Sequence, residues 1–505
     1  MKNNTSNIKI ADLNILILLA LAKFLLHLLT NGEYGFHRDE LATLDDARFL
    51  AWGYVAYPPL TPFLARIQLE LFGTSLVGFR VFSSLAQSIA MVIAGLITGE
   101  LGGSRRSQVV TAIAVAIAPM SLISGALFQY VSFDYLWWVL IAYFMIRLLK
   151  SDNPRGWLAI GLVIGMGMIT KYTIIYLVAG LVGGILLTGY RHYLRSPWLW
   201  GGAGISLLIF LPNLIWQIQH NFVSLEFLFD IHARDIAIGR TEGFLPEQFV
   251  VCANLFTIPF WIGGLYFYFF KPEGKVYRPL GWMYVIPFVL FFATQGRSYY
   301  LAPAYPMLIA AGVFVWENWL AKLSSGKSRL VSLAAWAGLI LGSAMGIALM
   351  LPIASVKSGW WNVVSEVHDN FVEQIGWTEL TESVADIYSG LPVEERSRTG
   401  ILTGNYGEAG AINLYGAAYG LPKAISGVNS YWSRGYGNPP PETLIVLGFN
   451  RESVYKYFKF CYLAGHVTNQ YELENEETTY HPDIFLCRQP RYPWPELWKL
   501  LRSFA

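Results

Sequence analysis

Long apolar runs separated by short polar loops fill residues 14–351 of the chain. About eleven of these runs approach the roughly 20 residues that an α-helix needs to cross a bilayer. They lie at residues 14–29, 77–98, 109–127, 133–149, 157–169, 174–187, 198–218, 250–270, 280–293, 300–316 and 330–351. The fifth and sixth runs are short and meet at Thr170-Lys171-Tyr172-Thr173, and short, interrupted helices often line a cavity. The pattern predicts an α-helical integral membrane protein with about 11 transmembrane helices.

The polar loops between these runs fall into two classes. One class is rich in lysine and arginine, and the positive-inside rule places these loops and the N-terminus in the cytoplasm. Its basic residues are Lys2, Lys9, Arg105, Arg106, Lys150, Arg155, Arg191, Arg195, Lys271, Lys275, Arg278, Lys322, Lys327 and Arg329. The other class is aromatic-rich and mixed in charge, and includes residues 34–41, 128–132, 219–248 and 295–299. We expect this second class on the periplasmic face.

The tail after the last apolar run has a different pattern. Residues 363–388 show charged helical periodicity, and strand-like runs follow at residues 400–403, 443–448 and 484–487. The tail is long enough to form a small α/β core of its own. An odd number of spans places it in the periplasm. We therefore expect a transmembrane domain at residues 1–352 and a periplasmic α/β domain at residues 353–505.

Composition supports a membrane protein, with 54% hydrophobic and 14% charged residues. The net charge of +2 gives no reason to expect a nucleic-acid partner. The three cysteines lack the spacing of a metal site. Cys252 lies in an apolar run, whereas Cys461 and Cys487 could form a disulfide in an exported tail. The sequence leaves that pairing open.

One outward loop concentrates polar residues next to the first apolar run. It reads Tyr34-Gly-Phe-His-Arg-Asp-Glu-Leu41 and continues to Tyr57-Pro-Pro-Leu-Thr-Pro62. The adjacent carboxylates Asp39 and Glu40 would lie at a membrane surface, where charges are costly unless water, a partner or chemistry occupies them. We expect catalysis in this loop.

A series of motifs resembles bacterial members of the protein mannosyltransferase-like glycosyltransferases. That family includes the lipid A aminoarabinose transferases and has the GT-C fold. The matching motifs, in the order of the family, are His37-Arg-Asp-Glu-Leu41, Trp52-Gly-Tyr-Val-Ala-Tyr-Pro-Pro-Leu-Thr-Pro62, Phe133-Asp134, Ile169-Thr-Lys-Tyr-Thr173, Pro212-Asn-Leu-Ile-Trp-Gln217 with His220, Arg297-Ser-Tyr-Tyr-Leu-Ala-Pro-Ala-Tyr-Pro306, Gly404-Asn-Tyr-Gly-Glu-Ala-Gly410 and Ser426-Gly-Val-Asn-Ser-Tyr-Trp432.

The resemblance implies an inner-membrane enzyme. Such an enzyme would move a sugar from a polyprenyl-phosphate carrier to a lipid or glycan acceptor on the periplasmic face, with inversion at the anomeric carbon. One departure concerns the acceptor. Eukaryotic relatives carry a β-trefoil insert that the outward loop at residues 219–248 is too short to hold, which argues against a protein acceptor.

The expected reaction needs a base for the acceptor hydroxyl and cations for the departing phosphate. The family match makes Asp39 the base; the alternative is a carboxylate that only stabilises a helix N-terminus. Glu40 would orient the sugar or the loop, or serve structure alone. Asp134 would face the sugar or support Asp39, or cap the fourth apolar helix. His37 would bind the sugar or remain a solvated loop residue.

Two cations lie at outward ends of apolar runs. Lys171 and Arg297 would hold the donor phosphate, although side chains that extend to the interface would explain both. Tyr299 and Tyr300 would pack against sugar or lipid, or belong to an interfacial aromatic belt. His220 would contact the donor or be structural.

No redox cofactor is implied, and the fold leaves room for a divalent cation that bridges Asp39, Asp134 and the phosphate. The alternative function is a membrane transporter or lipid-linked sugar flippase, which predicts paired charges near the midplane and inverted repeats. A polysaccharide polymerase is a further rival. A single outward cavity that collects Asp39, Asp134, Lys171 and Arg297 would favour the transferase. The sugar, the acceptor and the oligomeric state stay open.

Overall fold

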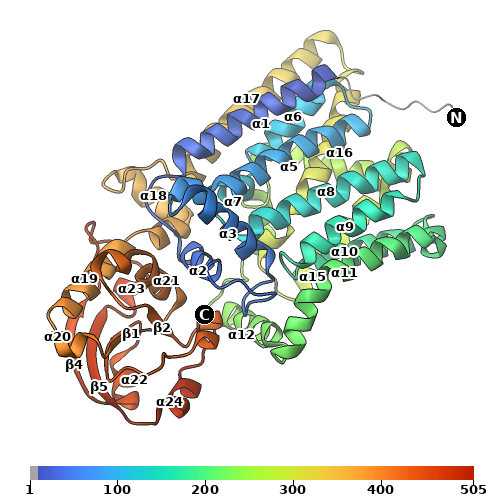
Figure 1. The fold of residues 1–505 in the computed structure, drawn as a ribbon. Coiled ribbons are helices and arrows are strands. Elements are labelled where there is room, and N and C mark those ends of the chain that lie inside the picture. The colour runs from blue at the N-terminus through green and yellow to red at the C-terminus, as the bar shows by residue number, and fades with distance from the viewer. Residues whose placement is uncertain (1–9) are drawn as a thin grey trace.

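The computed structural model describes residues 10–505, so Lys2 and Lys9 lie outside the described residues (Figure 1). Within that part of the chain, seven helical stretches are long and apolar enough to cross a membrane. They are Leu13–Thr30, Val81–Glu100, Tyr130–Ser151, Pro197–Gln219, Glu273–Ala293, Ser298–Leu320 and Ser325–Met350. The number rises to nine if each of two bent helix pairs counts as one span. The predicted multi-pass helical architecture is confirmed.

The bent pairs account for two more of the predicted runs. α6 (Arg105–Ala116) and α7 (Pro119–Ala126) meet at 64°. The break falls where Pro119 begins α7, because proline lacks the N–H that would continue the preceding helix. The second pair, Phe244–Val250 and Leu255–Phe270, bends by 84°. The remaining two runs are the 13-residue helices α9 (Gly156–Met168) and α10 (Ile174–Leu186), which are shorter than a full span.

The bundle consists of the helices that form these spans and the shorter helices that connect them. Besides α6, α7, α9 and α10, they are α1 (Ile10–Thr30), α2 (Arg38–Asp46), α3 (Leu60–Phe72), α4 (Leu76–Phe79), α5 (Val81–Glu100), α8 (Tyr130–Ser151), η1 (Arg191–Arg195), α11 (Pro197–Gln219), α12 (Val223–Ala237), α13 (Phe244–Val250), η2 (Leu255–Thr257), α14 (Ile258–Phe270), η3 (Glu273–Tyr277), α15 (Arg278–Ala293), η4 (Ser298–Ala304), α16 (Tyr305–Leu320) and α17 (Ser325–Met350).

The C-terminal part forms a mixed sheet covered by helices, as the tail pattern predicts. The sheet has the order β2-β1-β3-β5-β4, in which β1 pairs in parallel with β2 and β3, while β5 pairs antiparallel with β3 and β4. Its strands are β1 (Thr399–Thr403), β2 (Ala424–Ser426), β3 (Thr443–Leu447), β4 (Phe458–His466) and β5 (Asp483–Pro490). β1 and β3 are buried along their whole length, which explains why the middle of each strand is apolar.

Further helices precede, connect and follow the strands of this sheet. They are α18 (Gly359–Val367), η5 (Asp369–Gln374), α19 (Trp377–Ser389), α20 (Val393–Arg396), α21 (Tyr406–Tyr415), η6 (Gly416–Tyr419), η7 (Asn429–Arg434), α22 (Arg451–Tyr457), α23 (Glu476–Thr479) and α24 (Trp494–Leu500). Cys461 of β4 and Cys487 of β5 lie opposite each other and form a disulfide, while Cys252 is a buried free thiol. The structure therefore contains the pairing that the sequence left open.

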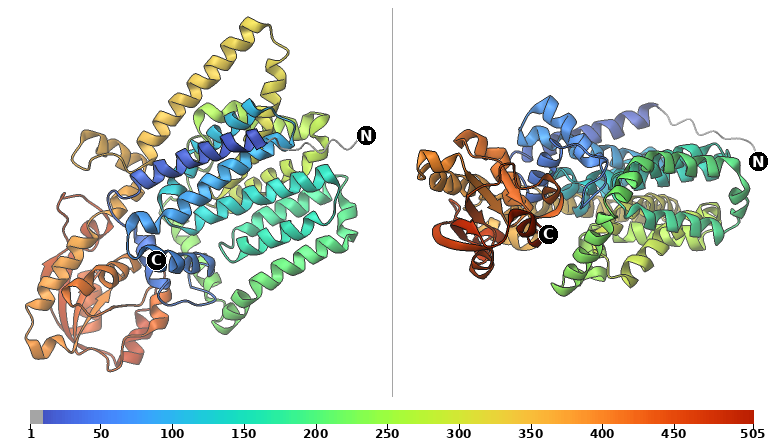
Figure 2. Two further views of the ribbon diagram at one scale, coloured as in Figure 1. Left: turned by 45° about the horizontal axis from the view of Figure 1, so that its top comes forward. Right: turned by 60° about the horizontal axis from the view of Figure 1, so that its bottom comes forward.

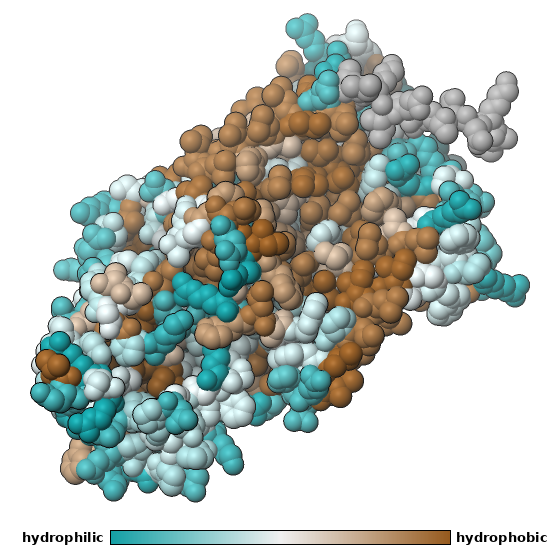
Figure 3. Space-filling model, in the orientation of Figure 1, coloured by the Kyte–Doolittle hydropathy of each residue, from teal (hydrophilic) through white to brown (hydrophobic). Residues whose placement is uncertain are grey.

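The C-terminal sheet unit sits at one end of the helix bundle, away from the first residues of α1 (Figure 2). In the face shown in Figure 3, apolar residues spread over the helices, and polar residues dominate the sheet unit. One continuous hydrophobic cluster nevertheless joins the two, because Leu41 of α2 belongs to the same cluster as Ile401 of β1 and Ile412 of α21. The division at residue 352 stays a prediction.

Helices α2 and α21 approach closely because α21 presents glycine at the contact. A Cβ built on Gly410 would lie 2.7 Å from the backbone carbonyl carbon of Leu41, and one on Gly407 would lie 3.0 Å from the Cβ of Arg38. Larger residues at either position would force the helices apart. The glycines of the Gly404–Gly410 motif thus place the C-terminal unit against the loop where we expect catalysis.

Candidate active site

A large cavity of about 2450 Å³ opens at the junction between the bundle and the C-terminal unit. Its polar part is lined by His37, Arg38, Asp39, Gln129, Lys171, Asp235, Arg297, Tyr299, Tyr300, Glu373 and Tyr406. Its apolar part is lined by side chains of α9, α10 and α11, among them Ile164, Met168, Ile174, Val178, Leu207 and Phe210. A cavity with one polar and one apolar part suits an amphipathic ligand.

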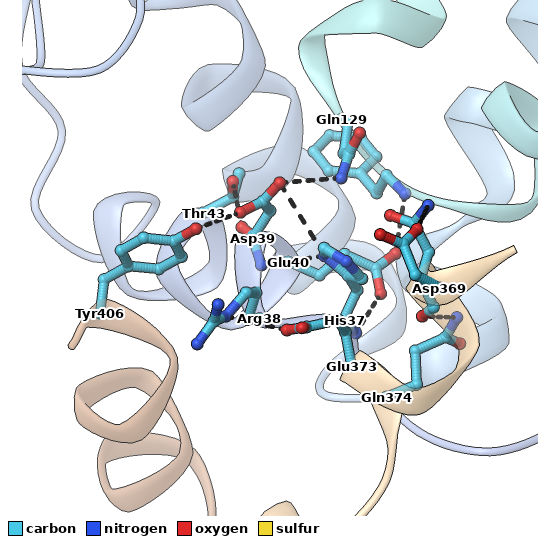
Figure 4. Close-up of polar contacts among 12 residues, drawn as sticks. His37, Arg38, Asp39, Glu40, Thr43, Gln129, Asp369, Glu373, Gln374 and Tyr406 are labelled. Atoms are coloured by element: carbon cyan, nitrogen blue, oxygen red, sulfur yellow. Dashed lines mark hydrogen bonds and ion pairs between the residues drawn. The ribbon is translucent and has the colours of Figure 1, made fainter. Parts of the chain in front are cut away.

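Asp39 lies in the first turn of α2, and its side chain is 40% exposed (Figure 4). The N-cap of this helix is His37, whose Nδ1 accepts the Asp39 N–H at 3.2 Å. Burial, as the largest effect, lowers the pKa of His37 and favours the neutral ring that accepts this bond. His37 is therefore a buried capping residue at the cavity wall rather than a solvated loop residue.

The two carboxylate oxygens of Asp39 each accept one hydrogen bond. Gln129 Nε2, at the N-cap of α8, donates to Oδ2 at 3.0 Å, and the Tyr406 hydroxyl of α21 donates to Oδ1 at 2.9 Å. Figure 4 shows the two donors on opposite sides of the carboxylate. Asp39 is thus held in one orientation at the surface of the cavity.

Glu40 does not line the cavity. Its carboxylate is fully buried and accepts hydrogen bonds from Arg80 Nε at 2.9 Å and Nη2 at 2.6 Å. It also accepts the backbone N–H of Phe128 at 2.7 Å and that of His37 at 2.9 Å. Because these donors occupy both oxygens, the structure favours the structural role over a contact with the sugar, which corrects the placement of Glu40 among the catalytic residues.

Asp134 is 2% exposed in α8 and lies behind the cavity wall rather than in it. Its Oδ1 has no hydrogen-bond partner among the described residues. Its charge and that of Lys171 are close enough to interact. Asp134 therefore lies near Lys171 without forming a salt bridge to it, and the expectation that it faces the sugar does not fit its position.

Lys171, between α9 and α10, is 8% exposed and lines the cavity. Its ammonium lies over three tyrosine rings, at 3.5 Å from the ring centre of Tyr300, 4.9 Å from Tyr130 and 5.6 Å from Tyr299. Such contacts favour a cation on the ring face. In the part of the chain with described side chains, no salt bridge joins Lys171 to a carboxylate. The ammonium does not extend into bulk water.

Arg297 is already paired with Asp235, a residue for which the sequence predicts no role. Its Nε and Nη2 donate to the two oxygens of Asp235 in α12, at 2.7 and 2.8 Å, and its Nη1 donates to the Tyr299 hydroxyl at 3.2 Å. This two-pronged geometry fixes the guanidinium at the cavity wall. A phosphate that binds Arg297 would share it with Asp235.

His220 stays outside the cavity lining. Its ring stacks on Trp216 with centres 4.0 Å apart, and its Nδ1 lies 2.8 Å from the Trp216 carbonyl oxygen. The structural role predicted as the alternative fits this position, and the donor contact does not.

Arg38 ties α2 to the C-terminal unit, a link that sequence reasoning missed. Its guanidinium forms salt bridges with Glu373 at 3.0 Å, with Glu477 at 2.8 Å and with Glu476. At the other end of α2, Asp45 and Asp46 both pair with Arg434 of η7. The sequence shows which of these residues are charged but not which of them pair, because every partner lies more than 300 positions away.

Three carboxylates surround the single positive charge of Arg38. One of them, Glu373, should make the free energy of unfolding depend on pH. Burial raises the pKa of Glu373 to about 7, Arg38 lowers it, and Glu477, Glu476 and Asp39 raise it. The folded state therefore holds a proton that the unfolded chain releases near pH 4.5. The free energy of unfolding is expected to fall as the pH rises from 4.5 to 7, by up to about 3 kcal/mol.

Thermal unfolding of the purified full chain between pH 4.5 and 8 measures this effect. The variant Glu373→Gln should flatten the dependence, because its amide carries no proton to lose. Glu394→Gln, on the exposed surface of α20, is the matched control and should keep the wild-type slope. Identical slopes for wild type and Glu373→Gln would assign the dependence to another group.

The cavity thus collects six of the nine predicted site residues: His37, Asp39, Lys171, Arg297, Tyr299 and Tyr300. Glu40, Asp134 and His220 lie outside it. Gln129, Asp235 and Tyr406 join the site without having been predicted. Among the described residues, no group of three or more histidine, cysteine or acidic side chains is placed to hold a metal ion.

The chain is similar in sequence to a known protein family and to individual proteins. The family described as dolichyl-phosphate-mannose-protein mannosyltransferase matches residues 56–216. An undecaprenyl phosphate-alpha-4-amino-4-deoxy-L-arabinose arabinosyl transferase from Pseudomonas fluorescens is 25% identical over 319 residues, which cover 58% of this chain and 55% of that relative. The lipid A galacturonosyltransferase RgtD from Rhizobium johnstonii is 23% identical over 235 residues, or 43% of this chain and 48% of the relative. The chain spans about half the length of the curated relatives it matches.

Solved structures match over most of the chain. ArnT from Cupriavidus metallidurans bound to undecaprenyl phosphate aligns with a TM-score of 0.57 at 14% identity, over 93% of this chain and 97% of ArnT. An Archaeoglobus fulgidus oligosaccharyltransferase aligns with a TM-score of 0.54 at 13% identity, over 86% of this chain and 69% of its own. These likenesses confirm the predicted GT-C fold. The chain therefore has the GT-C fold, and its sequence is similar to that of an aminoarabinose transferase.

Proposed function

We propose that the chain is a glycosyltransferase that moves a sugar from a polyprenyl-phosphate carrier to a lipid or glycan acceptor of the cell envelope. The observation that carries the proposal is the meeting of Asp39, Lys171 and Arg297 at one cavity with a polar and an apolar part. Relatives named for undecaprenyl-phosphate sugars and for lipid A support this choice of donor and acceptor.

In this mechanism Asp39 is the base. Its carboxylate takes the proton of the acceptor hydroxyl while the acceptor oxygen attacks the anomeric carbon. The bond from that carbon to the carrier phosphate breaks, and the phosphate leaves with the bonding electrons. Attack opposite the leaving group inverts the anomeric centre. No general acid is required, because a polyprenyl phosphate is a weakly basic leaving group.

Lys171 and Arg297 would stabilise the charge that grows on the leaving phosphate. The Lys171 ammonium lies over the face of the Tyr300 ring, and the Arg297 guanidinium donates hydrogen bonds to Asp235. Both are oriented before the ligand arrives, so little reorganisation accompanies the reaction. Tyr299 and Tyr300 hold Lys171 from one side and would pack against the donor from the other.

The apolar part of the cavity suits the isoprenoid chain of the donor. It lies among α9, α10 and α11, where α9 and α10 are too short to span the bilayer alone. In this proposal the chain is a bacterial inner-membrane protein with a cytoplasmic N-terminus and a periplasmic C-terminal unit. The positive-inside pattern of the loops supports that orientation.

A transfer assay tests the proposed function. The purified full chain is incubated with a panel of radiolabelled undecaprenyl-phosphate sugars and with membrane extract as acceptor. Transfer of one sugar would name the donor. A chain that instead moves the intact carrier lipid across vesicle membranes, without release of the sugar, would be a flippase and would overturn the proposal.

Loss of Lys171 should weaken binding of the carrier phosphate. Lys171→Met keeps the apolar stem and removes the charge, so we expect the dissociation constant for undecaprenyl phosphate to rise by about tenfold to a hundredfold. Binding is measured by titration of the purified protein in detergent. Lys357→Met, at an exposed position near Tyr471, is the matched control and should bind like wild type. Equal affinities for both variants would remove Lys171 from the donor site.

A further inference from the structure

The hydroxyl that holds Oδ1 of Asp39 comes from the C-terminal unit. Tyr406 begins α21, lines the cavity and donates to Asp39 at 2.9 Å across 367 positions of sequence. Figure 4 shows its ring reaching from the helix of the C-terminal unit toward the carboxylate on α2. Burial, with Asp39 close by, raises the pKa of this phenol, so it stays protonated and can only donate to the carboxylate.

The place of Tyr406 is fixed by its own surroundings. Asn405 caps α21 in a reciprocal pair with Glu408, so the helix begins at a defined residue. The guanidinium carbon of Arg38 lies 5.5 Å from the centre of the Tyr406 ring, and Gly407 lets the two helices approach. A hydroxyl held this firmly restricts the group that it binds.

With Gln129 on the other oxygen, Asp39 has one donor per carboxylate oxygen. A carboxylate oxygen has two lone-pair directions, so each keeps one free for an acceptor hydroxyl. The two donors come from different parts of the chain, α8 and α21, and neither belongs to the helix that carries Asp39. The orientation of the carboxylate is therefore set by the docking of the C-terminal unit as well as by the bundle.

We propose that Tyr406 is a positioning residue for Asp39, and that the C-terminal unit completes the active site by supplying it. The inference rests on the proposed role of Asp39 as base. Loss of this hydroxyl would leave the carboxylate with a single donor and free to rotate.

Other charged or titratable groups face Asp39 from each neighbouring element. His37 Nδ1 lies 3.9 Å from Oδ2, Arg38 precedes Asp39 on α2, Glu373 approaches from η5 and Tyr130 from α8. The experiment leaves all four in place, since Tyr406→Phe removes one oxygen atom and no charge.

The test compares kcat and KM for the donor in wild type and Tyr406→Phe. We expect kcat to fall about tenfold, with KM for the donor unchanged. Tyr415→Phe, at the other end of α21, is the control and should keep the wild-type kcat and KM. A wild-type kcat in Tyr406→Phe, or a rise in KM that accounts for the whole loss of kcat/KM, would overturn the inference.

A second measurement does not depend on catalysis. A double-mutant cycle with Tyr406→Phe and Asp39→Ala compares the unfolding temperatures of the single and double variants. If the hydroxyl holds the carboxylate, the double variant loses less than the sum of the single losses. Additive losses would overturn the inference even in an active enzyme. If the losses were non-additive but the chain had no transferase activity, the proposed function would be wrong, whereas the Tyr406–Asp39 contact would be confirmed.

Discussion

Asp39→Asn is expected to lower kcat by about a hundredfold to ten-thousandfold, because the amide cannot take the acceptor proton. The substitution keeps the shape of the side chain, and the capping of α2 by His37 uses only the backbone of Asp39. Donor binding should therefore change little. The measurement is sugar transfer from the donor identified in the panel, with binding of undecaprenyl phosphate measured on the same preparation.

Asp369→Asn is the matched control for that experiment. Asp369 also lines the cavity but is a residue of η5, in the C-terminal unit, to which we assign no chemical role. It should retain wild-type turnover. Equal turnover by wild type and Asp39→Asn would keep the class of enzyme but remove Asp39 as the base.

Glu40→Gln is expected to lower the free energy of unfolding by about 3–5 kcal/mol, because it leaves the charge of Arg80 buried without a counter-charge. Both side chains of the pair are fully buried, and Arg80 also donates to backbone oxygens of Asn31 and Gly35. Loss of the carboxylate should therefore disturb the whole loop that leads into α2. The measurement is the unfolding temperature of the purified protein.

Glu33→Gln, an exposed carboxylate in the same loop, is the control and should unfold like wild type. The double variant Glu40→Leu with Arg80→Met should recover much of the stability, since it removes both charges together. If Glu40→Gln instead unfolded at the wild-type temperature but lost transfer, Glu40 would act on the substrate after all.

The apolar runs could be predicted from the sequence because a helix in an apolar environment needs many apolar residues close together in the chain, and such a run is visible without knowledge of the fold. Every predicted run coincides with a helix or a bent helix pair, and even the shortness of α9 and α10 is visible in the hydropathy pattern. β1 and β3 were visible for the same reason. β2 has only three residues, so it leaves no strong apolar signal. β4 does carry an apolar run, but several of its apolar side chains, among them Phe460, Tyr462 and Leu463, are exposed at the sheet edge rather than buried.

The candidate site was only half visible, because pairing between distant residues leaves no local pattern. Arg80 lies inside an apolar run, where nothing in the sequence marks it as the partner of Glu40. Asp235 and Arg297 both lie in predicted outward loops, yet their separation of 62 positions hides the ion pair. Tyr406 was part of a recognised motif, but only the fold brings its hydroxyl to Asp39.

The continuous cluster of apolar side chains that joins α2 to the sheet unit bears on how such proteins can be recombined. A chimera that exchanged the C-terminal tail with that of a relative would replace Ile401 and Ile412 but keep Leu41, the side chain with which they form one cluster. It would also separate Arg38 and Asp45 from the charges that they pair with. A functional exchange of tails would need to carry the segment of α2 with it, because α2 and the C-terminal unit form one structural module.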